Sequence, residues 1–166
     1  VSARGRAAHT STGKGVSSNY LIAPFLADAA LLVKQLEAAP SYHNLEFDPP
    51  HNCINLVLND FGTRRNVTAP LTVATFGFRP MPNDRSDDVA AALCDLADKH
   101  GLESDFSVGD PFYVDPESDV VKLALEATGV ERPETVAFGT DSGAFKPTKA
   151  MVQFPPPKRG ATASIG

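Results

Sequence analysis

Four histidines are the side chains of this sequence best suited to catalysis or metal binding, and they are His9, His43, His51 and His100. A hydrolytic metal centre needs several imidazole and carboxylate ligands about 2 Å from the ion, with a further carboxylate as base. No two of the histidines have the spacing of a ligand pair, and no Glu-Glu pair occurs. We therefore expect separate surface or loop histidines and no metal ligands in this chain.

Two glycine-rich stretches invite comparison with catalytic and phosphate-binding loops. Gly139-Thr140-Asp141-Ser142-Gly143 places a serine near glycines, but not with the Gly-x-Ser-x-Gly spacing of a nucleophile elbow. Gly13-Lys14-Gly15 lacks the remaining residues of a phosphate-binding loop. Both stretches are interpreted as turns, and a small hydrolase acting through Ser142 and His9 stays open only as a minor alternative.

The composition limits the class of protein and its partners. With 166 residues, 42% of them hydrophobic, the chain can form one domain, or one domain and part of another, without disulfides. The net charge of -5 and the absence of a long basic run argue against nucleic acid as a partner. No run approaches the roughly 18 apolar residues of a membrane span. Cys53 and Cys94 lie in apolar runs, which predicts buried thiols in a reducing, cytoplasmic location.

Hydrophobic periodicity predicts the elements that must position these side chains. Apolar residues recur every three or four positions over residues 17–38 and again over residues 84–101, which predicts two amphipathic helices. Pro24 is expected to start the regular part of the first helix or to kink it. Residues 51–59 and 71–78 are typical of strands and should pair as a hairpin with a long loop.

The expected order over residues 1–108 is strand, helix, strand, strand, helix, strand. This order favours an α+β fold, a ferredoxin-like two-layer sandwich with two helices on one face of an antiparallel sheet. Residues 109–166 are too few to close an α/β layer, so an incomplete second segment with a proline-rich tail is expected beyond Gly109. Its expected elements are a helix capped by Asp115 and ended by Gly129, and short strands at 135–138 and 150–154.

Four motifs follow one another in the order seen in aminoacylase-type zinc metallopeptidases. They are Gly5-Arg6-Ala7-Ala8-His9-Thr10-Ser11 before a helix, Asn66-Val67-Thr68-Ala69-Pro70, Phe78-Arg79-Pro80, and the Gly139–Gly143 turn followed by Met151-Val152-Gln153-Phe154. Together they resemble the lid, or dimerisation, domain and the C-terminal part of the catalytic domain of this family. The family includes acetylornithine deacetylase, succinyl-diaminopimelate desuccinylase and carnosinase.

The resemblance implies a parent enzyme that hydrolyses the amide bond of an N-acyl amino acid or small peptide, using water bound to zinc, or to cobalt or manganese. It implies a homodimer in which a histidine of each lid enters the active site of the other subunit and stabilises the oxyanion there. His9 matches this catalytic histidine. It also implies that the planar guanidinium of Arg79 binds both oxygens of a substrate carboxylate. The other substrate-binding positions that the resemblance suggests are Asn66, Thr140, Ser142 and Gly143.

The chain also departs from the family pattern. The His-x-Asp and Glu-Glu motifs that carry the metal have no counterpart, so we expect a piece of a longer protein that binds no zinc and is inactive alone. No histidine follows His100, although the last ligand should fall near residues 155–159. Gly77 replaces the aspartate expected before Arg79. These departures motivate the alternative, a non-catalytic ferredoxin-like module for self-association or interaction.

Overall fold

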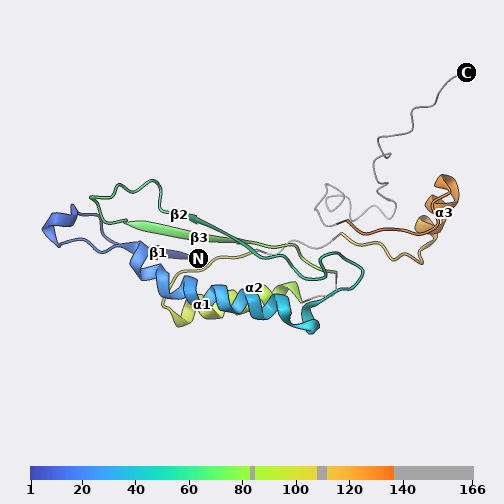
Figure 1. Cartoon of the computed structure of the whole chain (residues 1–166), viewed down its shortest axis with the longest axis horizontal. Helices are drawn as coiled ribbons and strands as arrows, with labels where there is room; N and C mark the ends of the chain where they lie inside the picture. Colours follow the sequence, from blue (N-terminus) through green and yellow to red (C-terminus); the bar gives the residue numbers. More distant parts are fainter. Residues whose placement is uncertain (83–84, 108–111, 137–166) are drawn as a thin grey trace, which may run out of the picture. The chain divides into compact units, whose positions relative to one another are not determined.

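A computed structural model describes residues 1–82, 85–107 and 112–136 of the chain (Figure 1). The chain divides into two compact units, one containing Val1–Pro111 and the other containing Phe112–Glu134. The first unit contains β1 (Ser2–Arg4), the 3-10 helix η1 (Thr10–Thr12), α1 (Ser18–Ala38), the 3-10 helix η2 (Pro40–Tyr42), β2 (Asn55–Asn59), β3 (Leu71–Gly77) and α2 (Ser86–Lys99). The second contains α3 (Asp119–Thr128).

The sheet of the first unit is antiparallel, and its strand order is β1-β3-β2. The register pairs Ser2 with Val73 on one side of β3 and Val57 with Thr75 on the other. A single bridge from Ser2 to Glu103 adds the segment after α2 on the other side of β1. The predicted α+β sandwich is therefore confirmed, with its fourth strand reduced to this one bridge.

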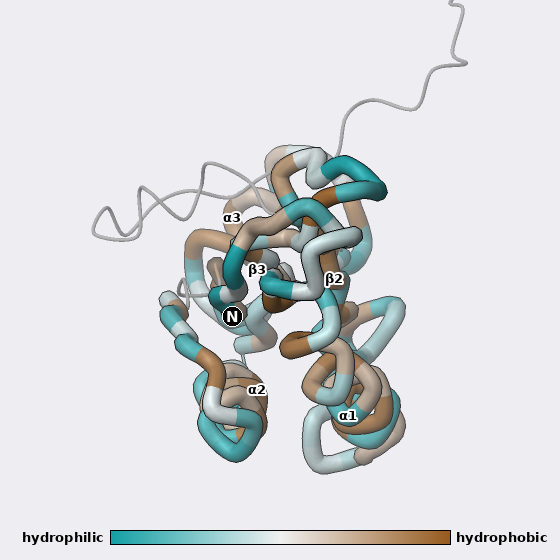
Figure 2. Tube along the Cα trace, turned by 90° about the vertical axis from the view of Figure 1, so that its left-hand side faces the viewer, coloured by the Kyte–Doolittle hydropathy of each residue, from teal (hydrophilic) through white to brown (hydrophobic). Residues whose placement is uncertain are grey.

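Both long helices cover the same face of the sheet, as Figures 1 and 2 show together. The buried positions of α1 are spaced as one helical face requires, and Phe25 packs edge-on against Phe76 of β3 with ring centroids 5.9 Å apart. The hydrophobic core between helices and sheet is formed by Ala3, Ile22, Phe25, Ala29, Leu36, Ala74, Val89, Leu93 and Ala97. This core holds β3 through Ala74, with Phe76 packed against it, and the candidate site residues lie beyond the two ends of this strand.

The predicted strand over residues 51–59 is shorter in the structure and begins at Asn55. Cys53 has a φ of 50°, a left-handed conformation that an extended strand cannot contain. The prediction of two buried thiols is also wrong, because Cys53 is exposed and Cys94 is half-buried. All five residues of β2 are exposed, so this strand lacks the buried face that its alternation predicted.

The helix predicted over residues 17–38 begins within one residue of its predicted start, whereas the helix predicted from residue 84 begins two residues later. Helix α1 begins at Ser18 and includes Pro24, so the proline does not start it. Helix α2 begins at Ser86, after Arg85, and residue 84, where the predicted helix began, lies outside the described residues. A contact with the preceding segment accompanies the start of α2, because the Ser86 hydroxyl accepts a hydrogen bond from the backbone N–H of Met81.

In the second unit, α3 begins after Ser118 rather than after Asp115, and Gly129 ends it with a φ of 68°. Of the strand expected at 135–138, the described residues 135–136 are not in a strand, and the strand expected at 150–154 lies outside the described residues. The domain boundary near Gly109 stays a prediction. No helix in the described ranges is long and apolar enough to cross a membrane.

We expect Gly5→Ala to destabilise the first unit strongly. A Cβ at Gly5 would lie 2.2 Å from the Val16 carbonyl oxygen and 2.7 Å from that of Ala69, and backbone atoms cannot yield as side chains do. The overpacking should cost about 1–3 kcal/mol in the free energy of unfolding, measured by urea denaturation. Gly77→Ala is the control, because a Cβ there meets no atom within 4 Å. Equal stabilities for the two variants would contradict the close backbone approach.

Candidate functional site

His9 lies at one end of the sheet, in a tip that two of the sequence motifs build together. His9 forms a bridge with Val67, and the backbone N–H of Thr10 donates to the Asn66 carbonyl at 2.9 Å. The Thr68 hydroxyl accepts from the Ala8 N–H at 2.9 Å and donates to a carbonyl of the facing segment. The segments around His9 and Asn66, separated by more than fifty positions in the sequence, are thus neighbours in the structure.

The local hydrogen bonds of His9 select the form of its imidazole. Nδ1 accepts the backbone N–H of Ser11 at 3.3 Å and lies 2.7 Å from the Ser11 hydroxyl oxygen. An Nδ1 that accepts a hydrogen bond carries no proton, so the proton of the neutral ring is on Nε2. The side chain is exposed, and therefore His9 offers its Nε2–H as a donor to a ligand at the tip.

Close packing under the tip keeps His9 in place. A Cβ at Gly15 would lie 2.1 Å from the Thr68 hydroxyl, and Arg6 donates from Nε to the Lys14 carbonyl at 2.8 Å. Gly13 has a φ of 63° and ends the 3-10 helix that His9 caps. The turn chemistry of Gly13-Lys14-Gly15 therefore serves the geometry of the His9 segment, in agreement with its interpretation as a turn.

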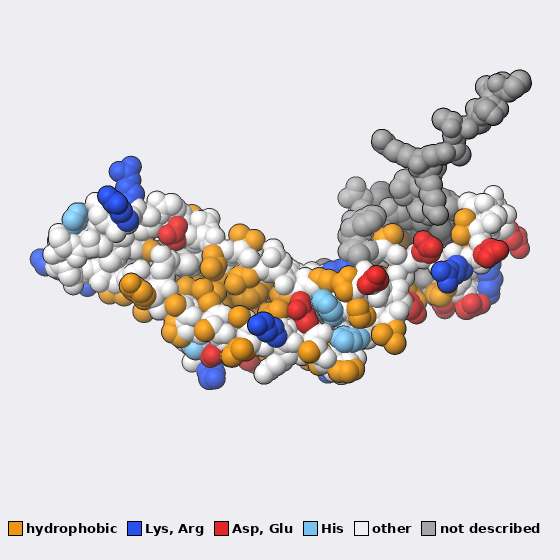
Figure 3. Space-filling model, viewed as in Figure 1, with side chains coloured by type: hydrophobic (Ala, Val, Ile, Leu, Met, Phe, Trp, Pro, Cys, Tyr) orange, Lys and Arg blue, Asp and Glu red, His pale blue; other side chains and the backbone are white. Residues whose placement is uncertain are grey.

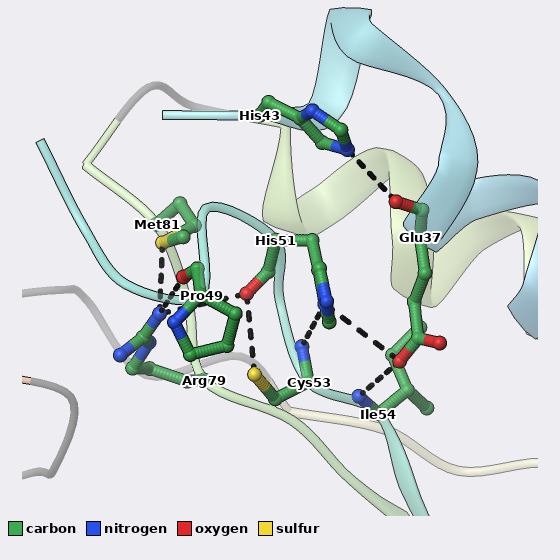
Figure 4. A network of polar contacts seen from close by, with 8 residues as sticks. All are labelled: Glu37, His43, Pro49, His51, Cys53, Ile54, Arg79 and Met81. Atoms are coloured by element: carbon green, nitrogen blue, oxygen red, sulfur yellow. Dashed lines mark hydrogen bonds and ion pairs between the residues drawn. The ribbon is translucent and has the colours of Figure 1, made fainter. Parts of the chain in front are cut away.

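Arg79 lies at the opposite end of β3, where it holds the loop before β2. Its Nη2 donates to the Pro49 carbonyl at 3.0 Å, and its guanidinium lies 5.1 Å from the centroid of the Phe47 ring. The Nε and Nη1 atoms are buried and have no acceptor among the described residues. Arg79 thus stabilises this loop, and two of its nitrogen donors form no hydrogen bond with a described residue (Figure 4).

His9 and Arg79 of one chain are too far apart to act on the same small substrate. Their segments flank the two ends of β3, whose seven residues span roughly 20 Å. Asn66 is exposed at the His9 end. The remaining predicted positions, Thr140, Ser142 and Gly143, lie outside the described residues, so neither their substrate role nor the Ser142 hydrolase alternative is tested.

The histidines are less separate than the sequence spacing suggested. The rings of His43 and His51 lie 6.3 Å apart, and His51 Nδ1 lies 3.8 Å from a carboxylate oxygen of Glu37 (Figure 4). The same Glu37 oxygen accepts the backbone N–H of Ile54 at 3.2 Å. Elsewhere, His100 pairs with Asp28 at 2.9 Å and so connects α2 to α1. No group of three or more His, Cys, Asp or Glu among the described residues could hold a metal ion.

Sequence reasoning missed this Glu37 and His51 network, together with the stacking of Arg79 on Phe47. Each contact joins a residue of the irregular loop between α1 and β2 to a residue outside it, Glu37 of α1 or Arg79 after β3, and no hydrophobic period relates the residues of that loop. The Phe47 contact depends on Arg79, which follows β3 and lies far along the sequence. In the sequence, the one feature that pointed to the Glu37 and His51 network was the presence of two histidines in the loop before a predicted strand.

A hollow of about 590 Å³ lies between β3, α2 and the segment that follows α2. Its lining is largely apolar on the helix side, with Leu93 and Cys94, and contains none of the predicted site residues. The candidate functional residues are therefore surface groups at the ends of the sheet rather than the walls of this hollow.

These features define a small α+β domain, a three-stranded antiparallel sheet with two helices on one face. Residues 1–105 match the family described as the peptidase dimerisation domain, and the chain belongs to this M20 peptidase family. The family includes aminoacylases and has metal-dependent members, in agreement with the resemblance recognised from the motifs. None of the curated proteins matches the chain.

We expect Arg79→Lys to destabilise the first unit by about 1–2 kcal/mol, because a lysine cannot keep the planar contact with Phe47 and the bond to Pro49 together. Urea unfolding followed by circular dichroism measures this loss. Arg65→Lys, which changes an exposed arginine in the same way, is the matched control and should leave the free energy of unfolding unchanged. An unchanged stability for Arg79→Lys would contradict the structural role of this guanidinium.

Proposed function

We propose that this chain is the dimerising lid of a metal-dependent hydrolase that cleaves the amide bond of N-acyl amino acids or small peptides. Its family membership supports the dimerisation and the hydrolase class. The observation that carries the proposal is that His9 and Arg79 lie far apart in one chain. In a dimer, His9 of one copy can lie close to Arg79 of the other. The N-acyl amino acid or peptide substrate and the role of each residue are proposed here in addition to the family membership.

The outer edge of β2 is the surface best suited to a second copy. The strand pairs with β3 on one side only, and no described segment pairs with its other side. Its apolar residues are exposed, with 38% for Leu56, 57% for Val57 and 52% for Leu58. A short edge strand with exposed apolar residues is a natural template for the same strand of another molecule.

Antiparallel pairing of two β2 strands around a twofold axis would bring the two halves of the candidate site together. A rotation of 180° about the sheet normal reverses the strand direction, so the His9 end of one lid lies beside the Arg79 end of the other. Each dimer then contains two equivalent composite sites. In this arrangement His9 serves the partner's site and not its own.

The chemistry of the two ends suits a tetrahedral intermediate of amide hydrolysis. When water adds to the carbonyl carbon, the oxygen becomes negative, and the Nε2–H of His9 can donate to it, a contact typically worth about 3 kcal/mol. Arg79 would bind a substrate carboxylate through its Nε and Nη1, which are buried in the separate lid and have to be uncovered for this contact, and Asn66 supplies an amide near His9. A metal bound elsewhere in the parent enzyme would supply the attacking water, since the described residues offer no ligand set for such an ion.

We expect Val57→Lys to weaken self-association by at least about tenfold in the dissociation constant. Val57 is the middle residue of β2, so the twofold axis would place two lysines opposite each other, and like charges directly across a strand pair repel. Sedimentation equilibrium measures the change. Leu123→Lys, an exposed substitution on α3, should leave association unchanged. A strictly monomeric wild type at high concentration would refute dimerisation itself.

In the full-length enzyme, we expect His9→Ala to lower kcat by about 10²-fold with a small change in KM, because the lost hydrogen bond acts mainly in the transition state. N-acetyl amino acids are the probe substrates, and His100→Ala is the control, in a histidine that pairs with Asp28 of α1. An unchanged kcat for His9→Ala would remove its catalytic role. Hydrolysis of none of these substrates by the wild type would instead favour the non-catalytic module, which shares the dimer but has no such activity.

A further inference from the structure

Positive charge is concentrated in the tip around His9. Arg6 lies shortly before His9, and its Nε donates to the Lys14 carbonyl at 2.8 Å, so the segments of Arg6 and Lys14 are neighbours. On the facing loop, the Arg64 carbonyl accepts at 3.0 Å from the N–H of the residue that bridges to His9, so Arg64 and Arg65 lie in the adjoining turn. The basic tip consists of Arg6, Lys14, Arg64 and Arg65. Figure 3 shows Lys and Arg side chains at this end of the first unit.

The side chains of the basic tip are available to a ligand. All four are exposed, and none forms an ion pair with a described residue. Asp60, the one acidic residue in the two loops of the tip, already accepts from the Gly62 N–H at 3.1 Å and from the Asn19 amide at 3.5 Å. Arg4 of β1, which precedes the tip, pairs with Glu103 at 3.2 Å, so its charge is matched locally. The tip therefore has four cations against one carboxylate, although the whole chain has a net charge of -5.

Such a cluster favours a small anion as its ligand. Cations held close together repel one another, and a negatively charged group placed among them removes this repulsion. A nucleic acid would meet the negative charge on the rest of the chain, and the basic tip has only four cations with which to offset it. A small substrate with one additional carboxylate needs no larger surface. Because His9 lies in the same tip, the anion that fits is the substrate on which His9 acts.

The composite site proposed above determines which part of the substrate reaches the basic tip. The carboxylate of the amino acid lies toward Arg79 of the other lid, and the carbonyl oxygen lies toward His9. In an N-acyl amino acid this carbonyl belongs to the acyl group, so the acyl chain continues from the reacting carbon at the His9 end. A negative charge on the acyl chain would therefore meet the basic tip, whereas the charge of the amino acid itself would lie toward Arg79.

We propose that the basic tip makes the enzyme selective for substrates whose acyl group carries a carboxylate. The inference rests on the amide hydrolysis and the composite site proposed above, and it adds the charge of the acyl group to them. The cations lie beside the acyl chain and not at the oxygen that becomes negative, so they stabilise the bound substrate and the transition state to a similar extent. The selectivity should therefore appear mainly in KM, whereas the loss of His9 should appear in kcat.

The test uses the full-length enzyme and two derivatives of the amino acid whose N-acetyl form it hydrolyses fastest. The N-glutaryl derivative ends in a carboxylate where the N-pentanoyl derivative ends in a methyl group. At low salt, the wild type should have a kcat/KM roughly fivefold or more higher for the glutaryl derivative. This preference should decrease as salt is added, because the Debye length shortens from about 10 Å at 0.1 M to about 3 Å at 1 M salt. The double variant Arg64→Gln with Arg65→Gln should lose most of the preference through a higher KM for the glutaryl derivative.

The ratio of the two kcat/KM values does not depend on the folded fraction of a variant, because both substrates are measured with one preparation. Lys99→Gln, which removes an exposed positive charge from the last turn of α2, is the control and should keep the wild-type preference. A wild type with no preference for the glutaryl derivative, or a double variant that keeps the wild-type preference, overturns the selectivity and leaves amide hydrolysis intact. A wild type that hydrolyses no N-acyl amino acid refutes the proposed function, and the selectivity with it.

Discussion

The pairing of β3 on both of its sides is the constraint from which the rest of the first unit follows. In the part of the chain that the structure describes, β3 pairs with a strand on each side, β1 on one and β2 on the other, whereas the outer side of β1 has the single Ser2–Glu103 bridge. The core face of β3 supplies Ala74 and Phe76 to the contact with α1 and α2. Its two ends lead to the segments of Val67 and Arg79, so the length of this strand determines how far apart His9 and Arg79, the candidate site residues, lie.

The sequence was sufficient for features that depend on local periodicity. The apolar spacing of α1 predicted a buried helical face, and Phe25 and Ile22 lie in the core as expected. It was insufficient where one backbone angle or a distant partner decides the structure. The left-handed Cys53 shortens β2, and the loop after α1 depends on Arg79, which lies about thirty positions further along the chain.

The candidate site could be predicted from motifs but not from physical spacing. Nothing in the spacing of His9 and Asn66 indicates that they are neighbours, because the contact arises from a bridge between His9 and Val67. Likewise, the sequence marked Arg79 as a carboxylate ligand without revealing its bond to Pro49. One guanidinium therefore stabilises a loop and retains unpaired donors, a combination that only the folded chain reveals.

The position of functional groups at the two extremes of one strand has a further consequence for the proposed assembly. A single encounter between two lids creates both composite sites at once, and a separated lid contains neither. Hydrolysis would then depend on the square of protein concentration when the protein is dilute, and linearly when it is abundant. Cellular abundance would itself regulate such an enzyme, without any effector molecule.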